Sequence, residues 1–153
     1  MLALIQVDAG DLRLDRLLQL YMHEWSALVG TAIGADARYV YDDLPYYEDR
    51  ERHAAYLILD GELPVGCALT LGDDDGTWHL EEFFVIAGAR RHGTGAAAAR
   101  LLFATRPGPW TFTVRPENPA ALAFWRRVLP DAPPVSELGD DGITRTRLRF
   151  TAP

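Results

Sequence analysis

Lysine is absent from this sequence of 153 residues, so all 15 of its basic side chains are arginines. The absence excludes a Walker-type phosphate loop, which needs a lysine to reach the phosphates, and it excludes Schiff-base catalysis by lysine. Cysteine occurs once, as Cys67 in the apolar stretch VGCAL. A single cysteine cannot form an intrachain disulfide, so we expect Cys67 to be a buried structural thiol in a protein of a reducing compartment.

Long apolar runs are also missing. The first residues, MLALIQVDAGDLRLD, become acidic after a few apolar positions, which is not the pattern of a secretory signal peptide. No stretch approaches the roughly 20 apolar residues that cross a bilayer. The formal net charge of -7 argues against a general nucleic-acid-binding role, which needs a basic surface. We therefore expect a cytoplasmic protein that binds neither nucleic acid nor membranes.

Metal-ligand spacing is absent as well, since the four histidines form no pattern with cysteines or carboxylates. We predict no metal site. What the sequence does contain is an ordinary globular composition, with 48% hydrophobic and 24% charged residues. A chain of this length and composition can bury one core, and we predict one domain over residues 1–153.

The N-terminal third predicts a strand, a helix and an irregular segment. Residues 2–7 are apolar, and Asp11 can cap a helix that ends at Gly30. Apolar side chains recur in this helix at three- and four-residue steps, which predicts one buried stripe. Residues 31–53 show no period, and their tyrosines either contact a substrate as part of a lid or pack on the core. The stripe consists of Leu14, Leu18, Tyr21, Met22, Trp25, Leu28 and Val29.

Residues 54–86 alternate as strands do. Two dipeptides typical of tight hairpins, Asp60-Gly61 and Asp75-Gly76, divide this stretch into three antiparallel strands. Beyond it, a helix is expected over residues 93–106, and Asn118 can cap another that reaches Pro130. The remaining strands are expected at residues 110–114, near Val135 and at residues 143–150.

This order of elements predicts an α+β fold, with a twisted, mostly antiparallel sheet of about six or seven strands and helices on both faces. A helical crossover joins the fourth and fifth strands. Because such crossovers are right-handed, these two strands should be parallel neighbours.

The stretch RRHGTG, residues 90–95, places the densest positive charge of the chain on flexible backbone at the start of a helix. A helix begins with N–H groups that lack partners in the helix and with partial positive charge. Gly93 and Gly95 leave those groups open because they carry no Cβ, and the arginines and the histidine add charge. The combination predicts a pyrophosphate-binding turn, and a basic loop with two turn glycines is the alternative.

Two nucleotide-binding patterns fit this turn. GTGAAA matches the loose dinucleotide fingerprint G-x-G-x-x-G/A, with Glu117 at a distance suited to a ribose hydroxyl. That fingerprint expects its first glycine directly after a strand, whereas AGARRH intervenes after Ile86. The second pattern is R-x-x-G-x-G, formed by Arg90, Gly93 and Gly95. It resembles the acetyl-coenzyme A signature of the GNAT acetyltransferase superfamily.

The sequence on both sides of the turn strengthens this resemblance over about residues 80–127. LEEFFV before the turn is similar to the fourth strand of the superfamily, and especially to the polyamine acetyltransferases. VRPENPAALAFWRRV after it is similar to the second cofactor motif. The stretch YMHEWS resembles a small group of predicted bacterial acetyltransferases.

The resemblance implies a binding site for acetyl-coenzyme A as the acyl donor. Backbone amides after Arg90 would hold the pyrophosphate, and the backbone of residues 83–85 would pair with the pantetheine arm where the fourth and fifth strands splay apart. Side chains of the second motif would flank that arm. The implied cofactor-binding residues are Phe83, Phe84, Val85, Arg90, Arg91, His92, Gly93, Thr94, Gly95, Ala96, Asn118, Ala121 and Phe124.

Two glutamates are the candidates for the general base that acetyl transfer to an amine requires. Because side chains alternate along a strand, we expect Glu81 and Glu82 on opposite faces, with only one facing the acceptor. Resemblance to the polyamine acetyltransferases implies Glu81, and resemblance to the bacterial group implies Glu82, which we favour slightly. The alternative roles are a surface charge and a structural hydrogen-bond acceptor.

The second motif departs from the family at Trp125. Many members have a tyrosine there, which protonates the leaving thiolate, and an indole supplies no usable proton. A thiol with a pKa near 8.5 is a tolerable leaving group without an acid. Tyr21 and the tyrosines of residues 41–47 are the remaining candidate acids.

The sequence thus predicts an acyltransferase that moves an acetyl group from acetyl-coenzyme A to a primary amine of a small molecule. Asp42 and Asp43 indicate a cationic acceptor. A non-catalytic acyl-coenzyme A-binding module is the alternative, and an NAD-binding protein is a distant third. The oligomeric state is left open, with a homodimer as one option.

Overall fold

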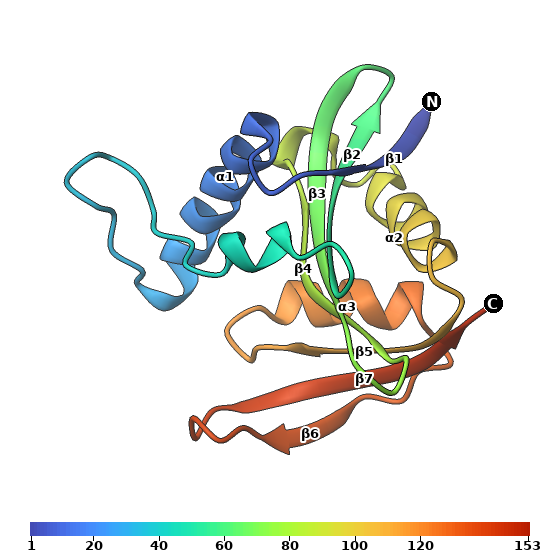
Figure 1. Cartoon of the computed structure of the whole chain (residues 1–153). Coiled ribbons are helices and arrows are strands. Elements are labelled where there is room, and N and C mark those ends of the chain that lie inside the picture. The colour runs from blue at the N-terminus through green and yellow to red at the C-terminus, as the bar shows by residue number, and fades with distance from the viewer.

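The strands assemble in the order in which the sequence supplies them, apart from one exchange at the C-terminus. The computed structural model describes residues 1–153, and its seven strands form one sheet in the order β1-β2-β3-β4-β5-β7-β6 (Figure 1). The predicted α+β fold is confirmed. The elements are β1 (Leu2–Val7), α1 (Leu12–Val29), the 3₁₀ helix η1 (Leu44–Glu48), β2 (His53–Asp60), β3 (Leu63–Gly72), β4 (Trp78–Val85), the 3₁₀ helix η2 (Ala87–Ala89), α2 (Thr94–Ala104), β5 (Gly108–Val114), α3 (Pro119–Val128), β6 (Val135–Leu138) and β7 (Thr144–Ala152).

Helix α1 begins and ends where its capping residues predict. The side chain of Asp11 accepts a hydrogen bond of 2.9 Å from the N–H of Arg13, and Gly30 ends the helix in the left-handed region with φ 72°. The apolar stripe is only partly buried, because Leu28 and Val29 are 43% and 38% exposed. The C-terminal turns of α1 border an open cleft instead of packed sheet, so the end of the stripe is left uncovered.

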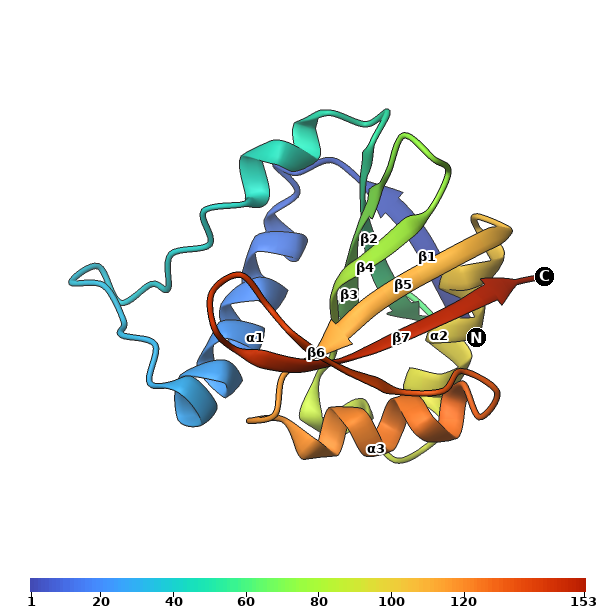
Figure 2. The same cartoon turned by 90° about the horizontal axis from the view of Figure 1, so that it is seen from below.

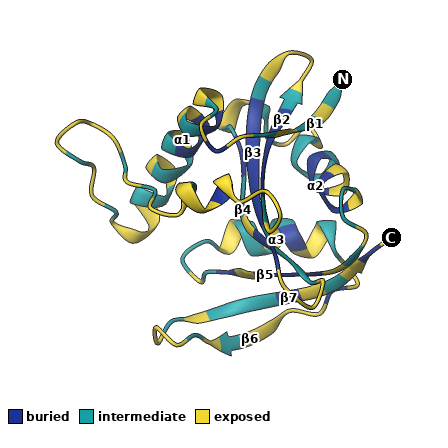
Figure 3. Cartoon of the chain, in the orientation of Figure 1, coloured by how far each residue is buried: buried dark blue, intermediate teal, exposed yellow.

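Helices cover both faces of the sheet, with α1 on one face and α2 and α3 on the other (Figure 2). The most continuous burial runs along β2 and β3 at the centre of the first half of the sheet (Figure 3). Cys67 lies there and is fully buried, as expected. Burial raises the pKa of its thiol to about 12, with a smaller contribution from the charge of Glu82.

The parallel pair of strands β4 and β5 is present and is short. The two strands pair only at Trp78 with Trp110 and at His79 with Thr111. Beyond these positions they separate, although β4 continues to Val85. The predicted splay is therefore real, and it opens toward the C-terminal ends of both strands, where the arginine-glycine turn follows β4.

Candidate functional site

A cleft of about 670 Å³ lies between the separated strands. Its walls come from α1, residues 40–43, β4, β5 and the first turns of α3, so it joins both halves of the sheet. Most of the predicted catalytic and substrate-side residues border it, including both glutamates of β4 and the aspartates of the irregular segment. Segments far apart in the sequence therefore meet at one cavity.

A β-bulge in β4 places both glutamates on the same face of the sheet. In the pairing with β3, Leu69 lies opposite Glu82 and Thr70 lies opposite Leu80, so Glu81 is an extra residue without its own partner. The prediction that the two glutamates point to opposite faces was wrong, because it assumed an unbroken alternation. Both side chains border the cleft, and both act electrostatically on Tyr47, which packs in the core on the α1 face.

Glu82 is held in a half-buried position by tyrosines. Its Oε1 accepts a hydrogen bond of 3.2 Å from the hydroxyl of Tyr41. Burial raises the pKa of Glu82 to about 7; the hydroxyls of Tyr21 and Tyr41 oppose this shift, and the negative charges of Glu81 and Asp43 add to it. A carboxyl group with this pKa can exchange a proton at neutral pH, which is the property of a general base.

Glu81 is more open to solvent than Glu82. Burial raises its pKa, and the charge of Asp43 acts in the same direction, whereas the neighbouring His79 and His53 lower it. His79 is itself paired with Asp73 at 2.6 Å between Nε2 and Oδ2. Glu81 therefore lies at the more solvent-exposed side of the cleft, close enough to two histidines for their charges to act on it.

The irregular segment is anchored to α1 and reaches the cleft. Gln19 exchanges two hydrogen bonds of 2.8 Å with the backbone of Tyr39, whose hydroxyl contacts His23 at 3.2 Å. Among the tyrosines of this segment, Tyr47 is buried in the core, as one of the two expectations had it, and Tyr46 is exposed. Tyr41 borders the cleft and reaches Glu82, so a contact with a substrate stays a prediction for this residue.

Unpaired amides line the turn that precedes α2. The N–H groups of residues 91–96 donate no backbone hydrogen bond, and the first bond of the helix runs from the N–H of Ala97 to the carbonyl of Gly93 at 3.0 Å. Arg91 and Gly93 adopt left-handed backbone, with φ 67° and 81°. Arg91, His92 and Gly93 are exposed, so the turn meets solvent with its donors free.

The two glycines of the turn have different physical roles. A Cβ on Gly93 would meet no atom within 4 Å, so its left-handed backbone and not the available space calls for glycine. A Cβ on Gly95 would lie 3.1 Å from Cε2 of Phe124. Gly95 therefore lets the ring of Phe124 on α3 pack against the start of α2.

The side chain of Arg90 is engaged within the protein. Its Nη2 donates to both carboxylate oxygens of Glu24 at 2.7 Å, its Nε donates to the carbonyl of Val85 at 2.6 Å, and its guanidinium lies over the ring of Phe84. Arg90 therefore ties the turn to α1, a role that the sequence did not indicate because Glu24 is 66 residues away.

The predicted pantetheine-binding residues lie where the strands separate, on both faces of β4. Phe83 stacks on Phe124 at 6.1 Å between ring centroids, on the α3 side. Phe84 and Val85 are buried. Asn118 uses its side-chain oxygen to accept from the N–H of Ala121 at 3.1 Å, which caps α3 as predicted, and both residues border the cleft. The other members of the predicted set are the turn residues described above.

Trp125 sits in an aromatic cluster at the base of the cleft. It is 5% exposed, and its ring lies 4.7 Å from those of Phe112 and Phe124 and 5.1 Å from that of Phe83, between centroids. Its packing makes it part of the core as well as of the cleft wall. Two tyrosine hydroxyls lie closer to the glutamates: burial raises the pKa of Tyr21 and that of Tyr41, so both keep their protons at neutral pH.

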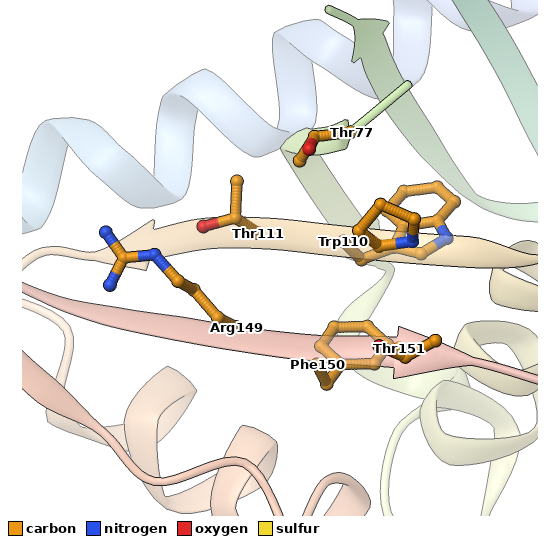
Figure 4. A pocket seen from close by; sticks show the side chains of 7 residues that line it. Thr77, Trp110, Thr111, Arg149, Phe150 and Thr151 are labelled. Atoms are coloured by element: carbon orange, nitrogen blue, oxygen red, sulfur yellow. The ribbon is translucent and has the colours of Figure 1, made fainter. Parts of the chain in front are cut away.

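A second, smaller groove of about 390 Å³ lies at the other end of β5, near the start of β4. Thr77, Trp110, Thr111, Arg149, Phe150 and Thr151 line it (Figure 4). It contains no carboxylate and lies at the paired end of β4 and β5, away from the turn before α2. Its lining also includes no histidine and no cysteine.

No group of three or more histidine, cysteine or acidic side chains is arranged to hold a metal ion. None of the helices has the length and the apolar character needed to span a membrane.

A mixed sheet with a short, splayed parallel pair, a cleft between the two strands and a turn of unpaired amides after the first of them defines a fold that is found among acyltransferases. The model of the acetyltransferase (GNAT) family matches residues 14–129, and the chain belongs to this family. Family and fold support acyl transfer and imply the use of an acyl-coenzyme A donor.

Solved structures share the fold along the whole chain. An acetyltransferase from Thermus thermophilus is 23% identical with a TM-score of 0.75, covering 99% of this chain and 97% of that one. A GNAT acetyltransferase from Staphylococcus aureus is 12% identical (TM-score 0.71, 100% of both chains). Mutant forms of the spermidine/spermine N-acetyltransferase from Vibrio cholerae are 13% identical (TM-score 0.61, 99% and 95%). None of the curated proteins is similar to the chain in sequence.

Proposed function

We propose that the protein transfers an acetyl group from acetyl-coenzyme A to a primary amine of a small molecule, with Glu82 as the general base. The observation that carries this proposal is the position of Glu82. It lies at the bulge where β4 and β5 part, half-buried, and its pKa is raised to about 7 by burial.

A base is needed because the acceptor arrives with its amine protonated. An alkylammonium with a pKa of about 10.4 is the free amine in only roughly one molecule in two thousand at neutral pH. Glu82 in its ionised form would take one proton from the ammonium and leave a free amine that can attack the thioester. Glu81, on the same face and more open to solvent, is suited to pass the proton outward.

The donor site follows from the amides and the splayed strands. The N–H groups of residues 91–96 would hold the pyrophosphate, and the backbone of residues 83–85 would hold the arm between the strands. The bound thioester supplies the acetyl group and a thiolate that can leave. The free amine attacks the thioester carbon, and an N–H near Val85 would stabilise the oxyanion of the tetrahedral intermediate. As this intermediate collapses, the C–S bond breaks and the second proton of the nitrogen passes to the leaving thiolate, directly or through a hydroxyl group.

Protonation of the leaving thiolate would not involve Trp125. Tyr21 and Tyr41 both border the cleft near Glu82 and retain their protons, since burial raises the pKa of each hydroxyl. Both hydroxyls favour the ionised form of Glu82, but only that of Tyr41 lies within hydrogen-bond distance, at 3.2 Å, and Tyr21 is therefore the less engaged donor. We therefore assign Tyr21 as the acid, if the thiolate needs one.

A cationic acceptor suits the acidic wall of the cleft. Asp42, Asp43, Glu81 and Glu82 all border it. Opposite charge in a partly enclosed site attracts an ammonium group and holds it beside the base.

The alternative is an acyl-coenzyme A-binding module without catalysis, which the buried Trp125 favours over an enzyme that relies on a tyrosine at that position. Calorimetry with coenzyme A and with NAD, combined with a thiol-release assay over a panel of amines, separates these functions. We expect binding of coenzyme A and thiol release with at least one amine. Binding of coenzyme A without thiol release from any amine would support the non-catalytic binding module. Affinity for NAD and none for coenzyme A would contradict both the enzyme and the module.

A further inference from the structure

Two arginines stand side by side at the edge of the cleft that is formed by β5 and β7. The antiparallel register of these strands is unbroken and ends with Val114 opposite Thr146. The next residues in this register are Arg115 and Arg145, and both border the cleft. Two like charges at adjacent positions repel each other, so a pair of guanidiniums at a sheet edge requires anionic partners.

Each guanidinium is held in place and keeps a free donor. Arg115 donates from Nε and Nη2 to Glu117 at 3.2 and 3.0 Å, and Arg145 donates from Nη1 and Nη2 to Asp141 at 2.8 and 2.6 Å. Neither Nη1 of Arg115 nor Nε of Arg145 has an acceptor in the protein. The side chains are 32% and 22% exposed, so a ligand in the cleft can reach them.

The pair faces the same side of the sheet as the two glutamates. Phe112 and Val114 pack in the core on the α2 and α3 side, and because the β5 register has no bulge, Arg115 must point to the other side. The cleft thus has an acidic wall with four carboxylates, from residues 42–43 and from the bulge of β4, and a basic wall with two guanidiniums. A purely cationic ligand would complement only one of these walls.

We propose that the acceptor is an amine that also carries a carboxylate, as an amino acid does. This proposal rests on the proposed acyl transfer. The ammonium group would lie against the acidic wall beside Glu82, and the carboxylate would accept charge-assisted hydrogen bonds from Arg115 and Arg145. The cleft would then disfavour an amine without the carboxylate, because the free N–H group on each guanidinium would be left without an acceptor in the ligand.

The experiment compares each amino acid with the amine formed by its decarboxylation: lysine with cadaverine, and phenylalanine with phenethylamine. Thiol release gives kcat/KM for each, and calorimetry in the presence of coenzyme A gives the affinity without turnover. The variants are Arg115→Gln and Arg145→Gln. The matched control is Arg149→Gln, which lies four residues further along β7, outside the cleft.

We expect the wild type to prefer the carboxylate member of a pair, and Arg145→Gln and Arg115→Gln each to reduce kcat/KM for that member about tenfold or more. Neither variant should lower kcat/KM for the decarboxylated amine or the affinity for coenzyme A, and Arg149→Gln should leave both unchanged for every ligand. Circular dichroism checks separately that the variants are folded.

Three results would overturn the proposal. The first is a preference for the decarboxylated amines, which would mean that the acceptor is purely cationic. The second is loss of coenzyme A affinity in the arginine variants, which would mean that the pair binds the donor. The third is an equal loss for both members of each pair. If no amine releases thiol, the proposed acyl transfer is wrong. The affinity for amino acids, compared between wild type and the arginine variants, then tests by itself whether the arginine pair binds a carboxylate.

Discussion

The hydroxyl of Tyr41 donates a hydrogen bond of 3.2 Å to Oε1 of Glu82, and it thereby joins the irregular segment after α1 to the bulge of β4. The contact connects residues 41 positions apart. It also couples the placement of the segment to the protonation of the glutamate, since a donor to the carboxylate favours its ionised form. Several testable consequences depend on this glutamate.

Replacement of Glu82 by Gln should lower kcat about a hundred-fold or more, because the amide cannot take a proton from the ammonium. The affinity for coenzyme A should not change. Glu81→Gln is the matched variant, and it should have a smaller effect because Glu81 is exposed and its carboxyl group accepts no hydrogen bond from a tyrosine hydroxyl. Steady-state thiol release is the measurement. A larger loss for Glu81→Gln would assign the base to the other residue of the bulge.

The pH profile of kcat/KM should have an acidic limb near the pKa of Glu82, about 7. Activity falls as the pH decreases through this value, because the protonated carboxyl group cannot act as a base. Tyr41→Phe removes a donor that lowers this pKa, so the limb should move to higher pH. Tyr46→Phe, at an exposed ring of the same segment, should leave the profile unchanged. A limb that stays in place in Tyr41→Phe would contradict the assignment.

Stability should also depend on the protonation of Glu82. Its pKa rises from 4.5 to about 7 on folding, so between these values the folded protein holds a proton that the unfolded chain has released. The free energy of unfolding therefore decreases as the pH rises through this window, by about 3 kcal/mol for this group.

Glu82→Gln abolishes this contribution. The free energy of unfolding is measured by urea denaturation. The difference between Glu82→Gln and wild type should change in favour of the variant as the pH rises from about 4 to about 8. Glu62→Gln in the exposed turn between β2 and β3 is the control, and its difference from wild type should stay constant. A constant difference for Glu82→Gln would mean that the carboxyl group is not desolvated.

Gly93→Ala should weaken binding of coenzyme A about tenfold or more, because a Cβ disfavours the left-handed backbone that presents the unpaired amides. Gly76→Ala is a closely matched control, since Gly76 has φ 86° and equal free space but lies in the turn between β3 and β4. Both variants should lose about 1–2 kcal/mol of stability. Calorimetry with coenzyme A separates them, and an equal affinity in both would remove the turn from the donor site.

Trp125→Tyr restores the residue that many family members carry. It should cost about 1–3 kcal/mol of stability, because the smaller ring leaves space in the aromatic cluster. Trp125→Phe carries the same loss of packing without a hydroxyl. If Tyr21 protonates the thiolate, the two variants should have equal kcat, whereas Tyr21→Phe should lower it. A kcat that rises only in Trp125→Tyr would indicate that the wild type lacks an acid.

Local signals in the sequence predicted most elements of the fold. Asp11 and Gly30 delimit α1, Asn118 caps α3, and glycine turns divide β2, β3 and β4, because capping and turn formation depend on residues close together in the chain. The splayed strands and the unpaired amides of residues 91–96 were likewise predicted, through family motifs that are themselves local.

The sequence by itself determined the fold, the turn before α2 and the identity of the two candidate bases. Only the tertiary structure decided that both glutamates share one face, that Arg90 is bound to Glu24 and that Arg115 and Arg145 stand side by side. The physical reason is that these relationships depend on register. A single extra residue in β4 reverses the direction of the side chains that follow it. Pairing between β5 and β7 brings together charged residues that are far apart in the sequence, and nothing in the sequence around them predicts that they meet.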